Sequence, residues 1–241
     1  MADNDKLGKL VAIGEIVVGV GFILRGIAKV QTPAANGGLL GKAPTLPRGN
    51  IIEKVTMKRV GNIDARVAEI QKLIRSGSEH PLVRENILEI LTKKCGDRWC
   101  VPEKSYLGEI SAAFWAQRDP KSPDAMRYVR DHTTLDQFTA ADKLLELHAG
   151  DCDCGTIMLG ARLRAVGYPL KLRIMQVKGS KADWDHIFLL AGTPPTNPTR
   201  WVALDWSEES AVPGWQAPGA EECAKTGKPA GMTQRVKDYD I

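Results

Sequence analysis

The sequence predicts an α+β fold in which helices pack on a short antiparallel sheet, and three observations support this prediction. Apolar residues recur with helical spacing in the first part of the chain after residue 51. A further helical segment begins near Cys152 and leads directly into a strand-like segment. Two more strand-like segments follow it. Helices that precede a run of consecutive strands are typical of the α+β class.

The composition indicates one globular unit with an appendage. The 241 residues, 43% of them hydrophobic, suffice for one sizeable core. The net charge of +4 is diffuse, and no segment combines clustered basic residues with regularly placed aromatics, so we expect no nucleic acid partner. Five cysteines are an odd number and do not suggest a disulfide framework. A reduced compartment is the default expectation, with a Cys95–Cys100 bridge left open.

Residues 1–30 form an apolar N-terminal segment with the central run LVAIGEIVVGVGFIL. This run is shorter than the roughly 20 apolar residues of a membrane span, and it contains Glu15. The chain starts with the acidic segment MADND, with no basic residues ahead of it, and no clear small-residue cleavage site follows the apolar run, so we do not predict a signal peptide. Two interpretations stay open: a buried or self-associating helix, or a segment that contacts a membrane or a partner protein.

The rest of the chain divides by composition into three parts. Residues 31–50 are rich in Pro and Gly and predict a linker. The folded domain is expected over residues 51–211. The segment PGWQAPGAEECAKTGKPAGM then predicts an extended C-terminal tail over residues 212–241.

Three helices are predicted in the first half of the domain. The segment NIDARVAEIQKLIRSGSEHPLVRENILEILTKK contains two of them, separated near SGSEHP, and Asn62 or Asp64 can cap the first. The apolar stripe of the first helix consists of Val67, Ile70, Leu73 and Ile74. The third helix is predicted over about residues 107–118, with a core side formed by Ile110, Phe114 and Trp115.

A fourth helix and three strands are predicted in the second half. The helix begins near Cys152 and ends before Gly167 and Pro169, a usual position for a C-terminal Gly and a following Pro. The strands are LKLRIMQV, DHIFLLAG and RWVALDW, and the Pro-rich loop TPPTNPT separates the last two.

The first turn of the fourth helix is suited to a reactive thiol. Unpaired backbone N–H groups and the positive end of the helix dipole favour thiolate, which predicts a lowered pKa for Cys152. Asp151 is the candidate N-cap. Residues two apart on a helix point about 200° away from each other. Cys152 therefore lies on the more apolar side, which should pack on the sheet, and Cys154 points elsewhere.

Two residues of the predicted strands can complete a catalytic set with Cys152. Of the four histidines, only His186 lies in a predicted strand after the helix, and Asp205 ends the next strand. A Cys at a helix start, a His on one strand and an Asp on its neighbour form a workable nucleophile, base and orienting acid. By spacing alone, structural roles for His186 and Asp205 remain open.

The segments AGDCDCGTIMLGARLRAVGYPLKLRI, DHIFLLAG and RWVALDWS resemble the transglutaminase-like cysteine peptidase superfamily. The resemblance implies a papain/transglutaminase-like core with Cys152 as nucleophile, His186 as base and Asp205 as orienting acid. With RVAEIQKLIRSGSEHPLVR, AAFWAQR and MRYVRD, it narrows to a subgroup found in tailed-phage and prophage genomes. It covers roughly residues 62–207. The chain departs from the family at Cys154, often acidic there, and at Gly155, often Lys or Gln.

The resemblance implies thiol-dependent acyl transfer or hydrolysis of amide or peptide bonds by a phage-encoded, virion-associated peptidase-like protein. Water as acceptor makes it a peptidase or amidase, and an amine makes it a transglutaminase. The backbone N–H of Cys152 can serve as one oxyanion donor. The alternative is a catalytically idle structural or assembly protein of a phage particle that keeps the fold.

The expected partners are a protein or peptide substrate and other phage structural proteins, bound through the N-terminal segment and the C-terminal tail. The expected location is the virion, or the host cytoplasm during assembly. We expect no cofactor and no metal. A metal site formed by His148, Cys152 and Cys154, with Cys95 and Cys100 as further ligands, is disfavoured because the two thiols of C-x-C diverge on a helix.

Overall fold

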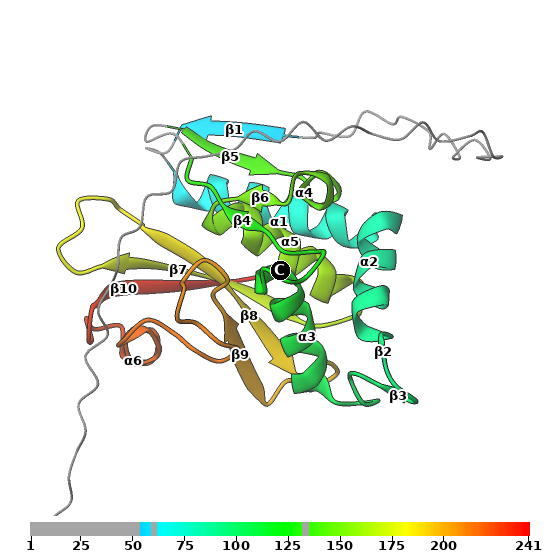
Figure 1. The fold of residues 1–241 in the computed structure, drawn as a ribbon. Helices are drawn as coiled ribbons and strands as arrows, with labels where there is room; N and C mark the ends of the chain where they lie inside the picture. Colours follow the sequence, from blue (N-terminus) through cyan, green and yellow to red (C-terminus); the bar gives the residue numbers. More distant parts are fainter. Residues whose placement is uncertain (1–53, 59–61, 132–134) are drawn as a thin grey trace, which may run out of the picture. The chain divides into compact units, whose positions relative to one another are not determined.

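A computed structural model describes residues 54–58, 62–131 and 135–241, which belong to one compact unit, Arg48–Ile241 (Figure 1). The predicted apolar segment 1–30 and the linker 31–50 lie outside the described residues. Among the described helices, none is both long enough and apolar enough to cross a membrane. The predicted α+β class is confirmed: helices pack on a four-stranded antiparallel sheet.

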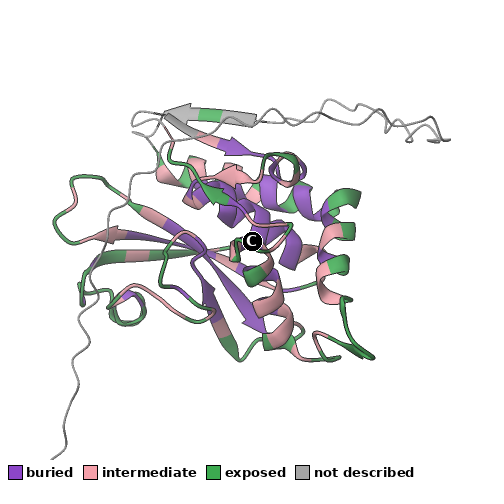
Figure 2. Cartoon of the chain, in the orientation of Figure 1, coloured by how far each residue is buried: buried purple, intermediate pink, exposed green. Residues whose placement is uncertain are grey.

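The helical part of the unit is built around one central helix. Its elements are α1 (Ile63–Glu79), α2 (Pro81–Leu91), α3 (Tyr106–Arg118), α4 (Ala141–Leu147) and α5 (Cys152–Ala165). Helix α5 contacts each of the other four helices and strand β8 of the sheet. Figure 2 shows it almost wholly buried, as expected of a helix that is surrounded on all sides. The start of α5 is therefore held from several directions.

The sheet has the strand order β10-β7-β8-β9, with antiparallel pairing throughout. The strands are β7 (Leu170–Val177), β8 (His186–Thr193), β9 (Arg200–Leu204) and β10 (Thr233–Asp240). Three smaller ladders pair β1 (Lys54–Lys58) with β5 (Leu135–Thr139), β2 (Lys94–Cys95) with β3 (Arg98–Trp99), and β4 (Arg127–Tyr128) with β6 (Ala149–Gly150). The β4–β6 ladder is parallel, and β6 leads directly into α5.

The first three helices follow the predicted pattern, with one exception. The Asn62 side chain caps α1 by accepting from the backbone N–H of Asp64 at 2.9 Å, and Pro81 occupies the first turn of α2. The predicted apolar stripe of α1 is buried. In α3, Ile110 and Phe114 are buried, but Trp115 is 42% exposed, so its assignment to the core side is wrong.

The C-terminal residues differ from the predicted extended tail. Residues Ala220–Thr226 form helix α6, and β10 pairs along nearly the whole length of β7. The segment 212–241 thus supplies an edge strand of the central sheet. Strand β10 carries few buried residues, although Tyr239 packs against the main core and Val236 against the smaller cluster on the other face of the sheet.

A disulfide joins Cys95 and Cys100 and closes the β2–β3 hairpin. The bridge that the sequence left open is therefore present, and these two sulfurs are not available as metal ligands. Cys152, Cys154 and Cys223 remain thiols. Of these, Cys152 is the partly exposed one, whereas Cys154 and Cys223 are buried.

The two faces of β8 meet different surroundings. Ile187, Leu189 and Ala191 join the main hydrophobic core together with α5. Phe188 and Leu190 belong to a smaller cluster on the other face. Because side chains alternate along a strand, His186 shares the face of Phe188, and the two rings lie 5.8 Å apart. His186 is the first residue of β8, so it lies at an end of the strand.

Candidate active site

The start of α5 is fixed by its own sequence. Asp151 adopts an extended conformation and caps the helix by accepting from the backbone N–H of Cys154 at 3.3 Å. Gly150 lies against Cys154 so closely that a Cβ on Gly150 would stand 2.4 Å from the Cys154 Cβ. In the sequence Gly150-Asp151-Cys152, the glycine thus allows β6 to lie close to the first turn of α5, and the aspartate caps this helix. Together they place Cys152 as the first residue of the helix.

His186 and Asp205 are brought together at the end of the sheet. Leu189 pairs with Leu204 across β8 and β9, so the same register continued by one residue sets Asp205 opposite Phe188 and diagonal to His186. His186 Nε2 lies 2.6 Å from Asp205 Oδ2, and the Ser207 hydroxyl donates to the other carboxylate oxygen at 3.1 Å. Asp205 is only 2% exposed. The buried carboxylate thus takes part in two hydrogen bonds, one through each oxygen. Because the bond to His186 uses Nε2, the other ring nitrogen, Nδ1, is available for another partner.

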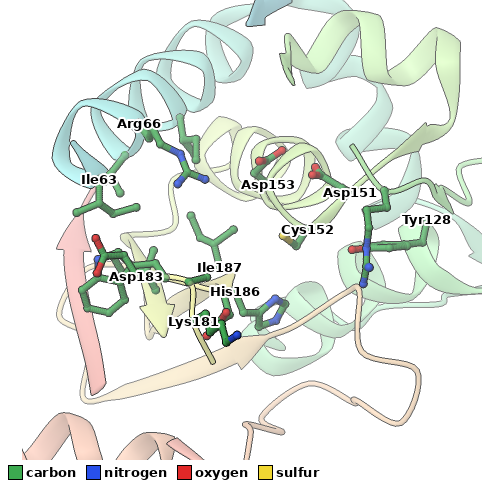
Figure 3. A pocket seen from close by; sticks show the side chains of 17 residues that line it. Ile63, Arg66, Tyr128, Asp151, Cys152, Asp153, Lys181, Asp183, His186 and Ile187 are labelled. Carbon is green, nitrogen blue, oxygen red and sulfur yellow. The ribbon is translucent and has the colours of Figure 1, made fainter. Parts of the chain in front are cut away.

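Cys152 borders the same cavity as His186. This cavity has a volume of about 630 Å³, and its lining includes both side chains (Figure 3). The backbone N–H of Ile187, the residue after His186, donates to the Cys152 sulfur. The structure therefore brings together Cys152, His186 and Asp205, the three site residues that the sequence predicted.

A residue that the sequence analysis did not select, Trp206, lies against the first turn of α5. Its indole Nε1 donates to the Cys152 carbonyl oxygen at 3.3 Å, and the side chain is buried. A Cβ on Gly155 would stand 1.7 Å from the Trp206 ring. Gly155 is therefore required by the indole, which explains why a long side chain cannot occupy this position. The signal in the sequence was a glycine inside the predicted helix, three residues after Cys152.

Replacing Gly155 by alanine is expected to destabilise the unit by about 3 kcal/mol, because the buried Trp206 ring has no room to move away. Helix propensity alone predicts the opposite, a gain of about 1 kcal/mol. Urea unfolding measures the difference. Gly160→Ala is the matched control in the same helix, since the nearest atom to the new Cβ is the end of the Ile74 side chain at 2.9 Å, so the effect should be smaller than at Gly155. A Gly155→Ala variant as stable as the unchanged chain would contradict this account of Trp206.

The surroundings of Cys152 disfavour its thiolate. Burial raises the pKa of the Cys152 thiol well above its usual value, and the carboxylates of Asp153, Asp151 and Asp205 raise it further. The N–H group of Ile187 acts in the opposite direction but does not compensate. The predicted lowered pKa is therefore wrong. The positive end of the helix dipole is outweighed by desolvation and by three negative charges. Cys152 is a protonated thiol at neutral pH.

Alkylation of Cys152 by iodoacetamide should accordingly be slow at pH 7 and should still be rising above pH 9, because the reagent reacts with thiolate. Asp153→Asn removes the largest of the three carboxylate contributions and should move the dependence of the alkylation rate on pH to lower pH. Peptide mapping of the alkylated protein follows Cys152 alone, and Cys154→Ser serves as the control that leaves this profile in place. A profile that levels off below pH 7 would refute the raised pKa.

Asp151, Asp153 and Cys154 could hold a cation, since one donor atom from each lies within 4.8 Å of the others. This group does not include His148, Cys95 or Cys100, which the sequence had offered as ligands. Each member already has a structural role or partner: Asp151 caps α5, and the Cys154 thiol donates to the Gln137 carbonyl at 3.2 Å. The two carboxylates of this group contribute to the negative charge near Cys152, and their contacts do not require a metal.

The remaining cavity wall is partly apolar and partly charged. Apolar side chains come from α1, from the sheet and from the loop before β8: Ile63, Val67, Ile70, Ile174, Trp184 and Ile187. Tyr128 and Arg130, from the segment MRYVRD, border the opposite end near Asp151. Burial raises the pKa of Tyr128, and the nearby Cys152 sulfur adds to this shift. The cavity thus extends from Cys152 toward α1, and its lining includes the cationic residues Arg66, Arg130 and Lys181.

Comparison with known proteins finds similarity in fold alone. No family model matches this chain, and neither does any curated protein. A crystal structure of Rad4-Rad23 crosslinked to an undamaged DNA is similar, with 14% sequence identity and a TM-score of 0.38 over 73% of this chain and 44% of that chain. Rad4-Rad23 bound to a 6-4 photoproduct UV lesion has 17% identity and a TM-score of 0.37 over 73% and 42%. The match spans less than half of either solved chain.

These comparisons correct two predictions. Assignment to the tailed-phage subgroup of the transglutaminase-like cysteine peptidases is overturned, because no family model or curated protein matches and the similar solved structures are Rad4-Rad23 complexes. The exclusion of nucleic acid from the expected partners is corrected as well, since a similar solved structure is a Rad4-Rad23 complex crosslinked to DNA. What remains is the coarser statement that the fold is α+β, with helices packed on an antiparallel sheet.

Proposed function

We propose that this chain is a thiol-dependent acyl-transfer enzyme that acts on amide bonds, with Cys152 as nucleophile, His186 as base and Asp205 as orienting acid. The observation that carries the proposal is the 2.6 Å bond between His186 Nε2 and the buried Asp205 carboxylate, at the border of the cavity that Cys152 lines. A buried carboxylate bonded to one ring nitrogen fixes the tautomer and stabilises imidazolium. The other nitrogen, Nδ1, is then a proton acceptor.

The raised pKa of Cys152 sets the order of events. The thiol loses its proton to His186 Nδ1 as the sulfur attacks the carbonyl carbon, because a stable thiolate is disfavoured before attack. The new C–S bond forms while the carbonyl oxygen becomes an oxyanion, and the backbone N–H of Cys152 is the proposed donor to it. The C–N bond then breaks, the imidazolium gives its proton to the leaving amine, and a thioester remains. Water or a second amine releases the acyl group.

The apolar wall of the cavity favours an apolar side chain on the acyl part of the substrate. Ile63 and Trp184 are its partly exposed members and lie on α1 and on the loop before β8. Burying one leucine-sized side chain there contributes roughly 1.5–3 kcal/mol, which corresponds to a preference of about tenfold or more over a charged side chain.

Trapping the thioester tests the proposal. The chain is incubated with p-nitrophenyl esters of N-acetyl-leucine and of N-acetyl-glutamate, and intact and peptide masses are recorded after acid quench. We expect an acyl adduct on Cys152 that hydroxylamine removes, formed faster from the leucine ester. Cys154→Ser should keep the adduct and Cys152→Ser should lose it. An adduct on another cysteine, or none with either ester, would refute the proposal.

A second candidate is a protein that keeps this fold and binds a partner without turnover. The observation that favours it is the ring of carboxylates around Cys152, which raises the pKa of the thiol. The same trapping experiment distinguishes the two functions, since a binding protein forms no adduct on Cys152.

A further inference from the structure

Two consecutive residues at the end of α3 contact both halves of the candidate site. The Gln117 side chain is buried and donates to the carbonyl oxygen of Gly155, in the first turn of α5, at 2.9 Å. Its neighbour Arg118 points to the turn that follows β9. The end of α3 therefore contacts the helix that carries Cys152 and the turn that begins with Asp205.

Within the described residues, the hydrogen bonds of the Arg118 guanidinium go to main-chain carbonyls, and the group also lies 5.7 Å from the centroid of the Phe114 ring. Its Nη1 donates to the carbonyl oxygens of Asp205 at 3.5 Å and Trp206 at 3.3 Å. Nη1 also donates to the Glu208 carbonyl and Nη2 to the Glu209 carbonyl. A single planar cation thus gathers four carbonyls of residues 205–209, a stretch without regular secondary structure in the described chain.

We propose that Arg118 is a positioning residue that holds the 205–209 turn and thereby orients the Asp205 carboxylate toward His186. The inference rests on the proposed function, and it adds a residue that lies outside the cavity lining. Without Arg118, four carbonyls lose a charged donor, and the backbone that follows Asp205 becomes free to rotate, while strand β9 holds the backbone before it. The same turn carries Trp206, so the packing of its indole ring against Gly155 also depends on the position of the turn.

Arginine is suited to this task in a way that lysine is not. The guanidinium has five N–H groups in a fixed plane, so it can serve several acceptors at once, whereas an ammonium has three donors on one atom. Arg118→Lys should therefore hold the 205–209 turn in part, and Arg118→Met should not hold it. The half-buried Arg164 provides a matched control, because it also lies in the last turn of a helix and donates to a carbonyl, that of Ile241, at 3.4 Å.

The test combines hydrogen–deuterium exchange with acylation kinetics on the full chain, using the N-acetyl-leucine ester. In Arg118→Met we expect amides of residues 205–211 to exchange at least about tenfold faster, and kcat to fall by roughly 10²-fold with KM unchanged. Arg118→Lys should fall between, and Arg164→Met should match the unchanged chain in both measurements. When Arg118→Met is added to Asp205→Asn, kcat should fall by less than about threefold further, since the effect of Arg118 passes through Asp205.

Three results would overturn the inference: unchanged exchange in Arg118→Met, faster exchange with an unchanged kcat, or an effect that adds fully to that of Asp205→Asn. If Arg118→Met does not fold, Arg118→Lys supplies the same two measurements. Failure of the proposed function is recognised separately, since the unchanged chain would then form no acyl-enzyme, and the exchange data alone would still decide whether Arg118 holds the turn.

Discussion

Replacing His186 by alanine is expected to reduce acylation of Cys152 by about 10⁴-fold. The cause is the protonation state of the nucleophile: burial and three carboxylates keep the thiol protonated, so attack requires a base at hand. Asp205→Asn should cost a similar amount, because an amide can accept the Nε2–H bond but cannot stabilise the imidazolium. The double variant should be hardly worse than either single one, since the three residues act as one unit. Burst kinetics with the N-acetyl-leucine ester measure all three.

A histidine outside the cavity supplies the control. His148 ends α4 with a left-handed backbone at φ 48°, which asparagine tolerates, so His148→Asn should leave the acylation rate unchanged. Losses from His186→Ala and Asp205→Asn that multiply in the double variant would argue against a coupled pair. A residual rate close to that of the unchanged chain would remove His186 from the mechanism.

Replacing Asp124 by alanine is expected to destabilise the unit by about 3–5 kcal/mol, the largest stability effect that we predict. Asp124 accepts from Nη2 of Arg162 at 3.2 Å, and the Arg162 side chain is 1% exposed. Arg162 lies on α5 and also donates to Asn86 of α2 at 2.8 Å. Burial lowers the pKa of Arg162 to about 10, and Asp124 opposes this shift. Removing the carboxylate leaves a buried cation without its counter-ion.

The double variant Asp124→Ala/Arg162→Met should recover much of the lost stability, because it removes the cation together with its partner. An exposed pair provides the comparison: Lys225 and Glu221 lie 2.6 Å apart with side chains 71% and 62% exposed, and Glu221→Ala should cost less than about 1 kcal/mol. Urea midpoints at pH 7 give the values. If the double variant is less stable than Asp124→Ala, the cost of the buried charge is not the dominant effect.

The elements that local pattern defines were the ones predicted correctly. Helix α5 and strands β7 to β9 are apolar, bounded by turn residues and buried, so their sequences carry the signal of their environment. Strand β10 was missed because an edge strand with one solvent-facing side, TQRVKDYD, has no apolar alternation to recognise. The short helix α6, within a Pro- and Gly-rich segment, was missed for a similar reason.

The candidate site was predictable in its members but not in its electrostatics. A helix start, a strand histidine and a strand-end aspartate can be read from residue order. The raised pKa of Cys152 has burial as its largest cause, and burial is not a property of local sequence, although the next two causes, Asp153 and Asp151, are neighbours of Cys152 in the chain. Trp206 and Arg118 were also out of reach, because each acts on residues about fifty or more positions away in the chain.

The pairing of β10 with β7 has a consequence for synthesis on the ribosome. Strand β7 is complete once residue 177 has been made, but its partner ends at residue 240. During the intervening time the growing chain presents an unpaired β7 edge, and unpaired edges are where nascent chains associate wrongly. At about 5–20 residues per second this interval lasts several seconds. The order of synthesis therefore leaves the β7 edge open to association with other chains until β10 has been made.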